Sequence, residues 1–276
     1  MTPPAAAAIP AAPPARRLAA LAAFAVATVL LIPAQRFLPG ALAWGVALAF
    51  ALGDGEVAFR RRLGVLLGVI ALLAAAPIHT GLDNAHFAKL GACFLAAVLV
   101  PNLILRRTDP GVLDLRFWPR RLRRRDLVYT ALAVPLAWVV IGIYFGRLTP
   151  EMPTHWWQPA EPSREWIWRL IVGVNCVGVW DELFFVSTTY AILRSLYPRG
   201  LANAAQAVVY TSVVCHMAFT GAGPVVVGVF ALTQGAMYEG SRCLLWVIVV
   251  HLIVDFFLVS AILHHYYGPA VSRLLF

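Results

Sequence analysis

Long apolar stretches separated by short polar segments make up most of this chain. Their apolar residues are continuous rather than alternating, which is the pattern of membrane helices and not of β-barrel strands. Several stretches are shorter than the roughly 20 residues that a helix needs to cross a bilayer, and the first two could form a re-entrant hairpin. The sequence therefore predicts an all-α fold, a polytopic transmembrane helical bundle of eight or nine spans. The candidate spans are residues 18–34, 38–53, 63–79, 86–105, 127–146, 166–197, 200–219, 223–239 and 243–264.

Three regions follow from this pattern. Residues 1–17 are rich in Ala and Pro without periodicity and are predicted to be a disordered N-terminal tail. Residues 18–146 are predicted to hold the N-terminal transmembrane helices, and residues 165–264 a C-terminal transmembrane core.

The composition supports lipid as the solvent for most of the chain. Hydrophobic residues make up 61% and charged residues 13%, whereas soluble domains carry about 25% charged residues. The net charge of +9 comes from 21 Arg and one Lys. Because these Arg residues flank apolar stretches, we expect membrane lipids rather than nucleic acid as their partners.

The Arg residues also predict an orientation. If nine spans alternate, four Arg-rich segments fall on one side of the membrane. By the positive-inside rule this side, which includes the N-terminus, is cytoplasmic. The segments are residues 16–17, 60–62, 106–125 and 194–199.

Ionisable residues inside the apolar stretches are the candidates for function. Asp181, Glu182 and Asp255 lie within such stretches, as do His216 and His251. A buried charge costs roughly 2.5–3.5 kcal/mol on insertion scales, and such residues usually face a bundle interior or a water-filled cavity. Three of the four spans near the end of the chain thus supply three acids and two imidazoles.

The spacing of these residues limits how they can meet. His251 and Asp255 are four residues apart and share one helix face. Asp181 and Glu182 are adjacent, about 100° apart on a helix, so only one can point squarely at a shared centre. Residue counts place Asp181 about 24 Å and His251 about 12 Å from the nearest turns. Tilted or broken helices must close this gap, or the residues do not form one site.

The available groups suit hydrolysis by water rather than attack by a side chain. No Ser or Cys with an adjacent base stands out, whereas a buried carboxylate can take a proton from water and an imidazole can stabilise an oxyanion. A divalent metal such as zinc is an alternative, with His216, His251 and either Asp181 or Glu182 as ligands. The sequence has no HExxH motif.

Three blocks together resemble the CAAX prenyl proteases and their bacterial relatives of bacteriocin processing and self-immunity (CPBP, Abi-like). That family has a Glu-Glu-x-x-x-Arg helix, a Phe-x-x-x-His helix and a His-x-x-x-Asn/Asp helix. The corresponding blocks here are Asp181–Val186, Ser212–His216 and His251–Asp255. The resemblance covers about residues 165–260.

The resemblance implies an intramembrane endopeptidase that acts on a peptide or membrane-protein substrate. It assigns the general base to Asp181, the water and the oxyanion to His216 and His251, and assistance at the oxyanion to Asp255. Its bacterial members place the protein in the inner membrane. The family has been argued both as metal-dependent and as metal-free.

The sequence departs from the family pattern at three positions. Asp181 stands where the family has Glu, Val186 where it has Arg, and Ser212 where it has Phe. Either Glu182 takes over as base, or proteolysis is lost and the chain serves as a membrane binding or scaffold protein. A transporter that uses the acids as a proton relay is a third hypothesis, although no internal repeat supports it.

Overall fold

The computed structural model describes residues 13–79, 81–113, 115–148, 163–215 and 221–268. The described residues form helices joined by turns and short connections, and none of them lies in a β-strand, so the predicted all-α class is confirmed. The elements are α1 (Ala15–Leu31), α2 (Phe37–Leu52), α3 (Val57–Ala74), α4 (Asn84–Thr108), α5 (Arg124–Ile143), the π-helix η1 (Tyr144–Leu148), α6 (Arg164–Asp181), the π-helix η2 (Glu182–Tyr190), α7 (Ala191–Arg194), α8 (Arg199–Val214), α9 (Gly223–Ser241) and α10 (Leu244–Tyr267).

Four continuous helical segments of the described chain are long and apolar enough to cross a membrane. They are Asn84–Thr108, Arg124–Leu148, Arg164–Arg194 and Leu244–His265. The other helices are shorter or carry charges; α3, for example, contains Arg60, Arg61 and Arg62 within its first turns. The predicted count of eight or nine spans therefore stays a prediction. Of the predicted N-terminal tail, residues 1–12 lie outside the described residues, and α1 begins at Ala15.

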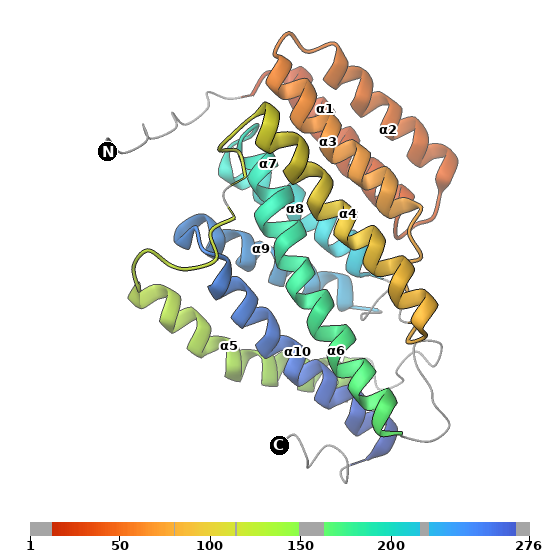
Figure 1. Cartoon of the computed structure of the whole chain (residues 1–276), viewed down its shortest axis with the longest axis vertical. Coiled ribbons are helices and arrows are strands. Elements are labelled where there is room, and N and C mark those ends of the chain that lie inside the picture. Colours follow the sequence, from red (N-terminus) through yellow and green to blue (C-terminus); the bar gives the residue numbers. More distant parts are fainter. Residues whose placement is uncertain (1–12, 80, 114, 149–162, 216–220, 269–276) are drawn as a thin grey trace.

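The helices pack as an elongated bundle (Figure 1). At one end α1, α2 and α3 lie together, and at the other end α5 lies against α10. Between them α8 packs against α9, and α10 crosses α6. Because α1 also contacts α8 and η2 contacts α4, the N-terminal helices help to enclose the C-terminal ones.

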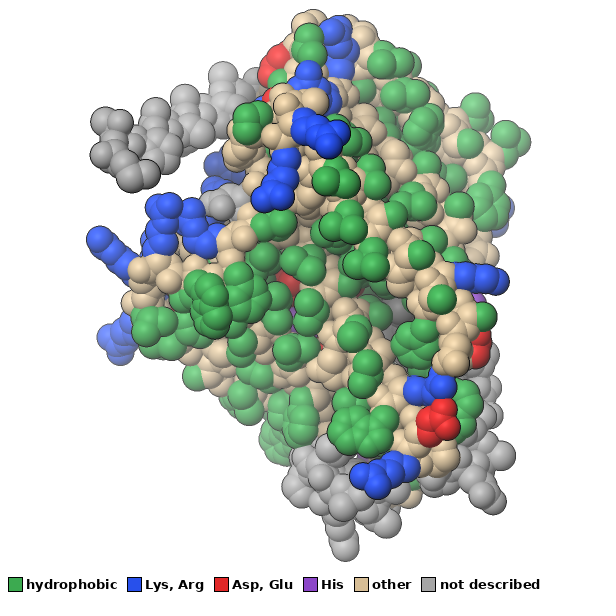
Figure 2. Space-filling view, in the orientation of Figure 1, with side chains coloured by type: hydrophobic (Ala, Val, Ile, Leu, Met, Phe, Trp, Pro, Cys, Tyr) green, Lys and Arg blue, Asp and Glu red, His purple; other side chains and the backbone are tan. Residues whose placement is uncertain are grey.

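Exposed apolar side chains cover much of the surface shown in Figure 2. The segment Arg124–Leu148, which comprises α5 and η1, is the clearest case, because only 17% of its apolar stretch is buried and Trp138 is 63% exposed. A soluble protein rarely exposes apolar surface so extensively. This surface fits a lipid environment.

Charged contacts gather where several Arg-rich segments meet. Arg17 pairs with Asp54 at 2.8 Å, and Tyr197 Oη donates to Arg17 O at 3.0 Å. Arg62 lies 3.3 Å from Asp109 and also reaches Ser195 O. The segments that were predicted to share one side of the membrane thus contact one another at one end of the bundle.

The opposite end fixes how α4 and α6 begin. Ser163 Oγ caps α6 by accepting from Trp166 N at 3.2 Å. Arg169 then donates to Leu82 O at 2.9 Å and to Asn84 Oδ1 at 2.7 Å, which ties the first turns of α6 to the start of α4. Unpaired backbone groups at helix ends need such partners. This contact sets the relative height of the two helices.

Further along the same pair of helices, an aromatic contact leads to the acids. Trp180 stacks on Phe94, with ring centroids 3.7 Å apart, and its Nε1 donates to Phe94 O at 2.7 Å. Trp180 immediately precedes Asp181 in the chain. These contacts of Trp180 therefore fix the rotation of α6 about its axis just before Asp181, the last residue of the helix.

Candidate active site

The two adjacent acids lie at a change of helix type. Helix α6 ends at Asp181 and continues directly into the nine-residue π-helix η2, which begins at Glu182. Such π-helical insertions occur frequently at functional sites. Within η2, Ser187 Oγ and Thr188 Oγ1 both donate to Leu183 O, at 2.6 and 2.8 Å. These two hydroxyls are therefore engaged by the backbone.

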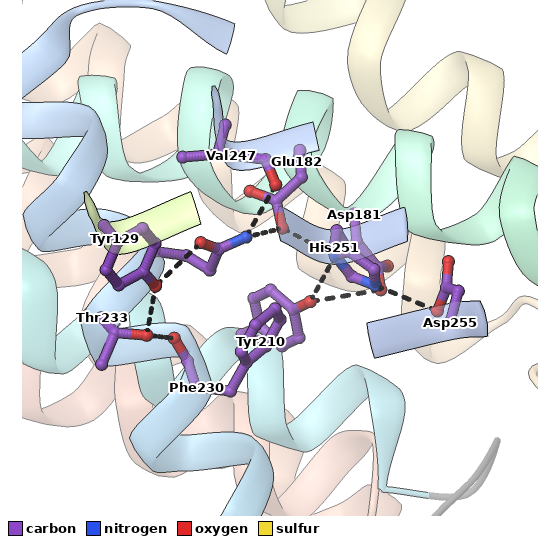
Figure 3. A network of polar contacts seen from close by, with 10 residues as sticks. Tyr129, Asp181, Glu182, Tyr210, Phe230, Thr233, Val247, His251 and Asp255 are labelled. Carbon is purple, nitrogen blue, oxygen red and sulfur yellow. Dashed lines mark hydrogen bonds and ion pairs between the residues drawn. The ribbon is translucent and has the colours of Figure 1, made fainter. Parts of the chain in front are cut away.

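One imidazole contacts all three acids (Figure 3). His251 Nδ1 lies 2.7 Å from Glu182 Oε1. Its Nε2 lies 3.7 Å from Asp181 Oδ2 and 3.6 Å from Asp255 Oδ1. The adjacent acids therefore reach different nitrogens of the same ring. When Nδ1–H donates to Glu182, Nε2 is the nitrogen that faces the two aspartates.

The start of α10 explains how His251 comes to the same depth as the acids. Cys243 and Leu244 are buried, and the N–H groups of Leu244 and Leu245 donate to Arg116 O and Phe117 O at 2.9 and 3.1 Å. The helix thus begins beneath the segment that precedes α5. Because α10 starts inside the protein, the number of residues between its start and His251 underestimates how far His251 lies from the surface.

A glycine allows α10 to cross α6 closely at this point. Gly178 lies on α6 one turn before the acids, and a Cβ placed there would meet Asp255 Oδ2. The same Cβ would come within 2.8 Å of His251 Cδ2. Small residues at helix crossings let backbones approach in membranes. Gly178 therefore makes room for the His251–Asp255 face beside Asp181.

The site opens on a large apolar cavity. Its volume is about 750 Å³, and its walls come from α4, α5, α6, α8, α9 and α10. Asp181, His251 and Asp255 line it, whereas Glu182, which is 0% exposed, does not. Asp181 Oδ1 and Asp255 Oδ2 have no hydrogen-bond partner among the described residues. Of the two adjacent acids, Asp181 is therefore the one available to a molecule in the cavity.

A tyrosine that the sequence analysis did not single out completes the described part of the site. Tyr210 Oη lies 3.4 Å from Asp181 Oδ2 and 3.2 Å from His251 Nδ1, and its ring packs on Phe185 with centroids 4.2 Å apart. It also lines the cavity. The signal that could have identified Tyr210 was a phenol in the apolar stretch before His216, but tyrosines in apolar helices are too common to mark a site residue.

His216 lies outside the residues that the structure describes. Helix α8 ends at Val214, earlier than the predicted 200–219 span, and Val214 lines the cavity. Within the described residues there is no group of three or more His, Cys, Asp or Glu arranged to hold a metal ion. The zinc set predicted from the sequence includes His216 and thus stays a prediction.

Comparison with known families identifies the region that carries this geometry. Residues 163–257 match a family model described as type II CAAX prenyl endopeptidase Rce1-like. This region of the chain is therefore similar to the CAAX-protease family. The match begins at the cap of α6 and ends in α10, so it includes Asp181, Glu182, His251 and Asp255. Comparisons with curated proteins and with solved structures gave no match.

The match confirms the resemblance read from the motifs for about a third of the chain. CAAX-type proteases are peptide hydrolases of membranes, and four helices here can cross one by length and composition. Together these findings indicate an integral membrane protein with a peptide or protein substrate. The departures from the family motif are buried: Val186 is 0% exposed and Ser212 is 3% exposed.

Proposed function

We propose that this protein is an intramembrane endopeptidase in which Asp181 activates water to hydrolyse a peptide bond. The observation that carries the proposal is the division of labour between the two acids. Asp181 lines the cavity with one oxygen unpartnered among the described residues, whereas Glu182 lies behind it against His251 Nδ1. A carboxylate that faces the substrate can take a proton from water.

The proposed roles of His251 and Asp255 follow from their positions. His251 Nε2 lies near both Asp181 and Asp255, and all three residues line the cavity, so a protonated ring can donate to the oxyanion of the tetrahedral intermediate there. Asp255 assists there. For His216, which lies outside the described residues, the family resemblance supports the role of orienting the water. If a divalent metal such as zinc takes part, His216, His251 and Asp181 or Glu182 are its proposed ligands, and it would polarise the carbonyl and the water.

In this proposal the substrate is a peptide or the tail of a membrane protein, as the family match supports, and the almost entirely apolar cavity walls suit an apolar segment of it. We propose that the protein lies in a bacterial inner membrane, with the N-terminus and the Arg-rich end of the bundle facing the cytoplasm.

Cleavage of a peptide library by protein purified into nanodiscs tests the proposal. Asp181→Asn should lower kcat by about 10²–10⁴-fold, the usual contribution of a general base. His251→Gln and His216→Gln should lower it as well. Asp126→Asn is a matched control, because Asp126 is also buried but does not line the cavity. A chelator arm tests the metal.

A binding or scaffold function is the second candidate. It is favoured by the shorter acid at 181 and by the apolar Val186, which is fully buried and provides no counter-charge. Wild-type protein that cleaves no more than folded Asp181→Asn and His251→Gln variants would decide for this alternative.

A further inference from the structure

Glu182 has a second partner that the family motif does not supply. Gln234 belongs to α9 and is 0% exposed. Its Nε2 donates to Glu182 Oε1 at 2.9 Å and to Val247 O at 3.0 Å. A buried amide is costly unless both of its ends are hydrogen-bonded, so its contacts constrain its neighbours.

The orientation of this amide is fixed by its surroundings. Val247 O can only accept, so the nitrogen of Gln234 must point to it. The other end, Oε1, lies 3.3 Å from Tyr129 Oη. The single hydroxyl proton of Tyr129 is shared between Gln234 Oε1 and Thr233 Oγ1, which lies 2.9 Å away, and the Thr233 hydroxyl itself donates to Phe230 O. The amide therefore cannot flip without leaving an acceptor facing an acceptor.

Gln234 thereby holds both halves of the Glu182–His251 pair. Val247 lies on α10 one turn before His251, so the amide bonds to the helix that carries the imidazole and to the acid that the imidazole contacts. Glu182 Oε1 accepts from Gln234 and from His251 Nδ1, while Oε2 has no partner among the described residues. A single oxygen thus joins η2, α9 and α10; Figure 3 shows Glu182 beside His251.

We infer that Gln234 is the positioning residue of this site: it holds Glu182 against His251 Nδ1 and so directs Nε2 towards Asp181 and the cavity. Val186, at the motif position of Arg, is an apolar core residue that cannot form a hydrogen bond to Glu182 through its side chain. Gln234 takes over that orientation from another helix, as a neutral donor. This inference rests on the proposed function.

Two substitutions of Gln234 test this role through kinetics. Gln234→Leu keeps the bulk but removes the donor, and should lower kcat by about 10–100-fold, as loss of a residue that orients a ligand or catalytic group does. KM should change by less than about threefold, because Gln234 does not line the cavity. Gln234→Glu should regain kcat as the pH is lowered, because only a neutral carboxyl group can donate to Glu182 Oε1.

Gln206→Leu is the matched control. Gln206 lies on α8, is also 0% exposed, and has no hydrogen-bond partner among the described residues. Its substitution should leave kcat and the pH profile as in wild type. If Gln234→Leu behaves like Gln206→Leu, or if Gln234→Glu has the same pH profile as Gln234→Leu, the positioning role is refuted.

A measurement without substrate separates this inference from the proposed function. The ¹⁵N spectrum of histidine-labelled protein in nanodiscs, with His251 assigned by its loss in His251→Gln, reports the protonation and surroundings of Nδ1. Gln234→Leu should shift this signal and Gln206→Leu should not. If wild-type protein cleaves nothing but Gln234→Leu still shifts the His251 signal, the peptidase proposal is overturned and the positioning role of Gln234 is kept. If Gln234→Leu leaves the signal unchanged, the positioning role is overturned.

Discussion

Replacing Gly178 by alanine tests whether the close crossing of α6 and α10 builds the site. The new Cβ would overlap Asp255 Oδ2 and come within 2.8 Å of His251 Cδ2. Neither neighbour is the free end of an exposed side chain, because His251 and Asp255 are 6% and 3% exposed. The helices must therefore separate, or the imidazole and the carboxylate must move.

The size of the effect follows from comparison with a second glycine. Gly68 lies inside α3, and a Cβ there would meet nothing within 4 Å. Gly→Ala inside a helix is favourable by roughly 0.5–1 kcal/mol where there is room. Inserting a methyl group into a packed contact costs about 1–3 kcal/mol. Since both variants share the helix preference, the difference between them should be about 1–3 kcal/mol in unfolding free energy.

Activity should fall more steeply than stability. A displacement of about 1 Å in a catalytic group can cost about 100-fold in rate. We therefore expect Gly178→Ala to lose about two orders of magnitude in kcat at a temperature where it is still folded, with Gly68→Ala unchanged. Thermal unfolding in detergent and peptide cleavage per folded molecule measure the two effects. If Gly178→Ala has the stability and kcat of wild type, the helices do not cross closely enough at Gly178 to position His251 and Asp255, and the prediction is refuted.

Two further predictions concern Tyr210 and the end of the bundle where Arg17 lies. Tyr210→Phe keeps the ring packing but removes the hydroxyl near Asp181 Oδ2, so kcat should fall about tenfold, matching one hydrogen bond to a charged group, while Tm stays within a degree or two; a large loss of Tm without a change in kcat would contradict this. Hydrogen bonds from the Arg17 guanidinium lower the pKa of Asp54 to about 2, from a usual 3.8. This lowered pKa stabilises the fold at pH values above the pKa of Asp54 in the unfolded state, and the stabilisation is lost as the pH falls through its pKa in the folded state. Asp54→Asn should therefore lower Tm at pH 7 but match wild type near pH 2. Equal Tm values at pH 7 would argue against the ion pair.

The family match and the described geometry support each other at the level of residues. The motif blocks for the first and third helices lie together around His251, as a shared site requires. The family's orienting Arg has no counterpart at Val186, yet Glu182 is still held by a side-chain donor. Glu182 is thus oriented by Gln234 instead of by an Arg at position 186.

Hydropathy and spacing determined the helical class and the candidate acids. Continuous apolar stretches leave helices as the simplest way to satisfy backbone groups in lipid, and charges inside them are costly enough to mark function. The four-residue spacing of His251 and Asp255 was sufficient to place them on one face, where they lie 3.6 Å apart. These properties are local in the chain, so the sequence alone reveals them.

Which acid faces the cavity was decided only by the tertiary structure. The change to a π-helix at Glu182, the buried start of α10 and the close approach at Gly178 all depend on neighbouring helices. The same holds for Tyr210 and Gln234, whose polar groups look unremarkable in sequence and gain their roles by contact across helices. Lateral packing and hydrogen bonds between distant segments have no periodic signal, so the pairing of Glu182 with His251, and the exposure of Asp181 to the cavity, appear only when the helices are assembled.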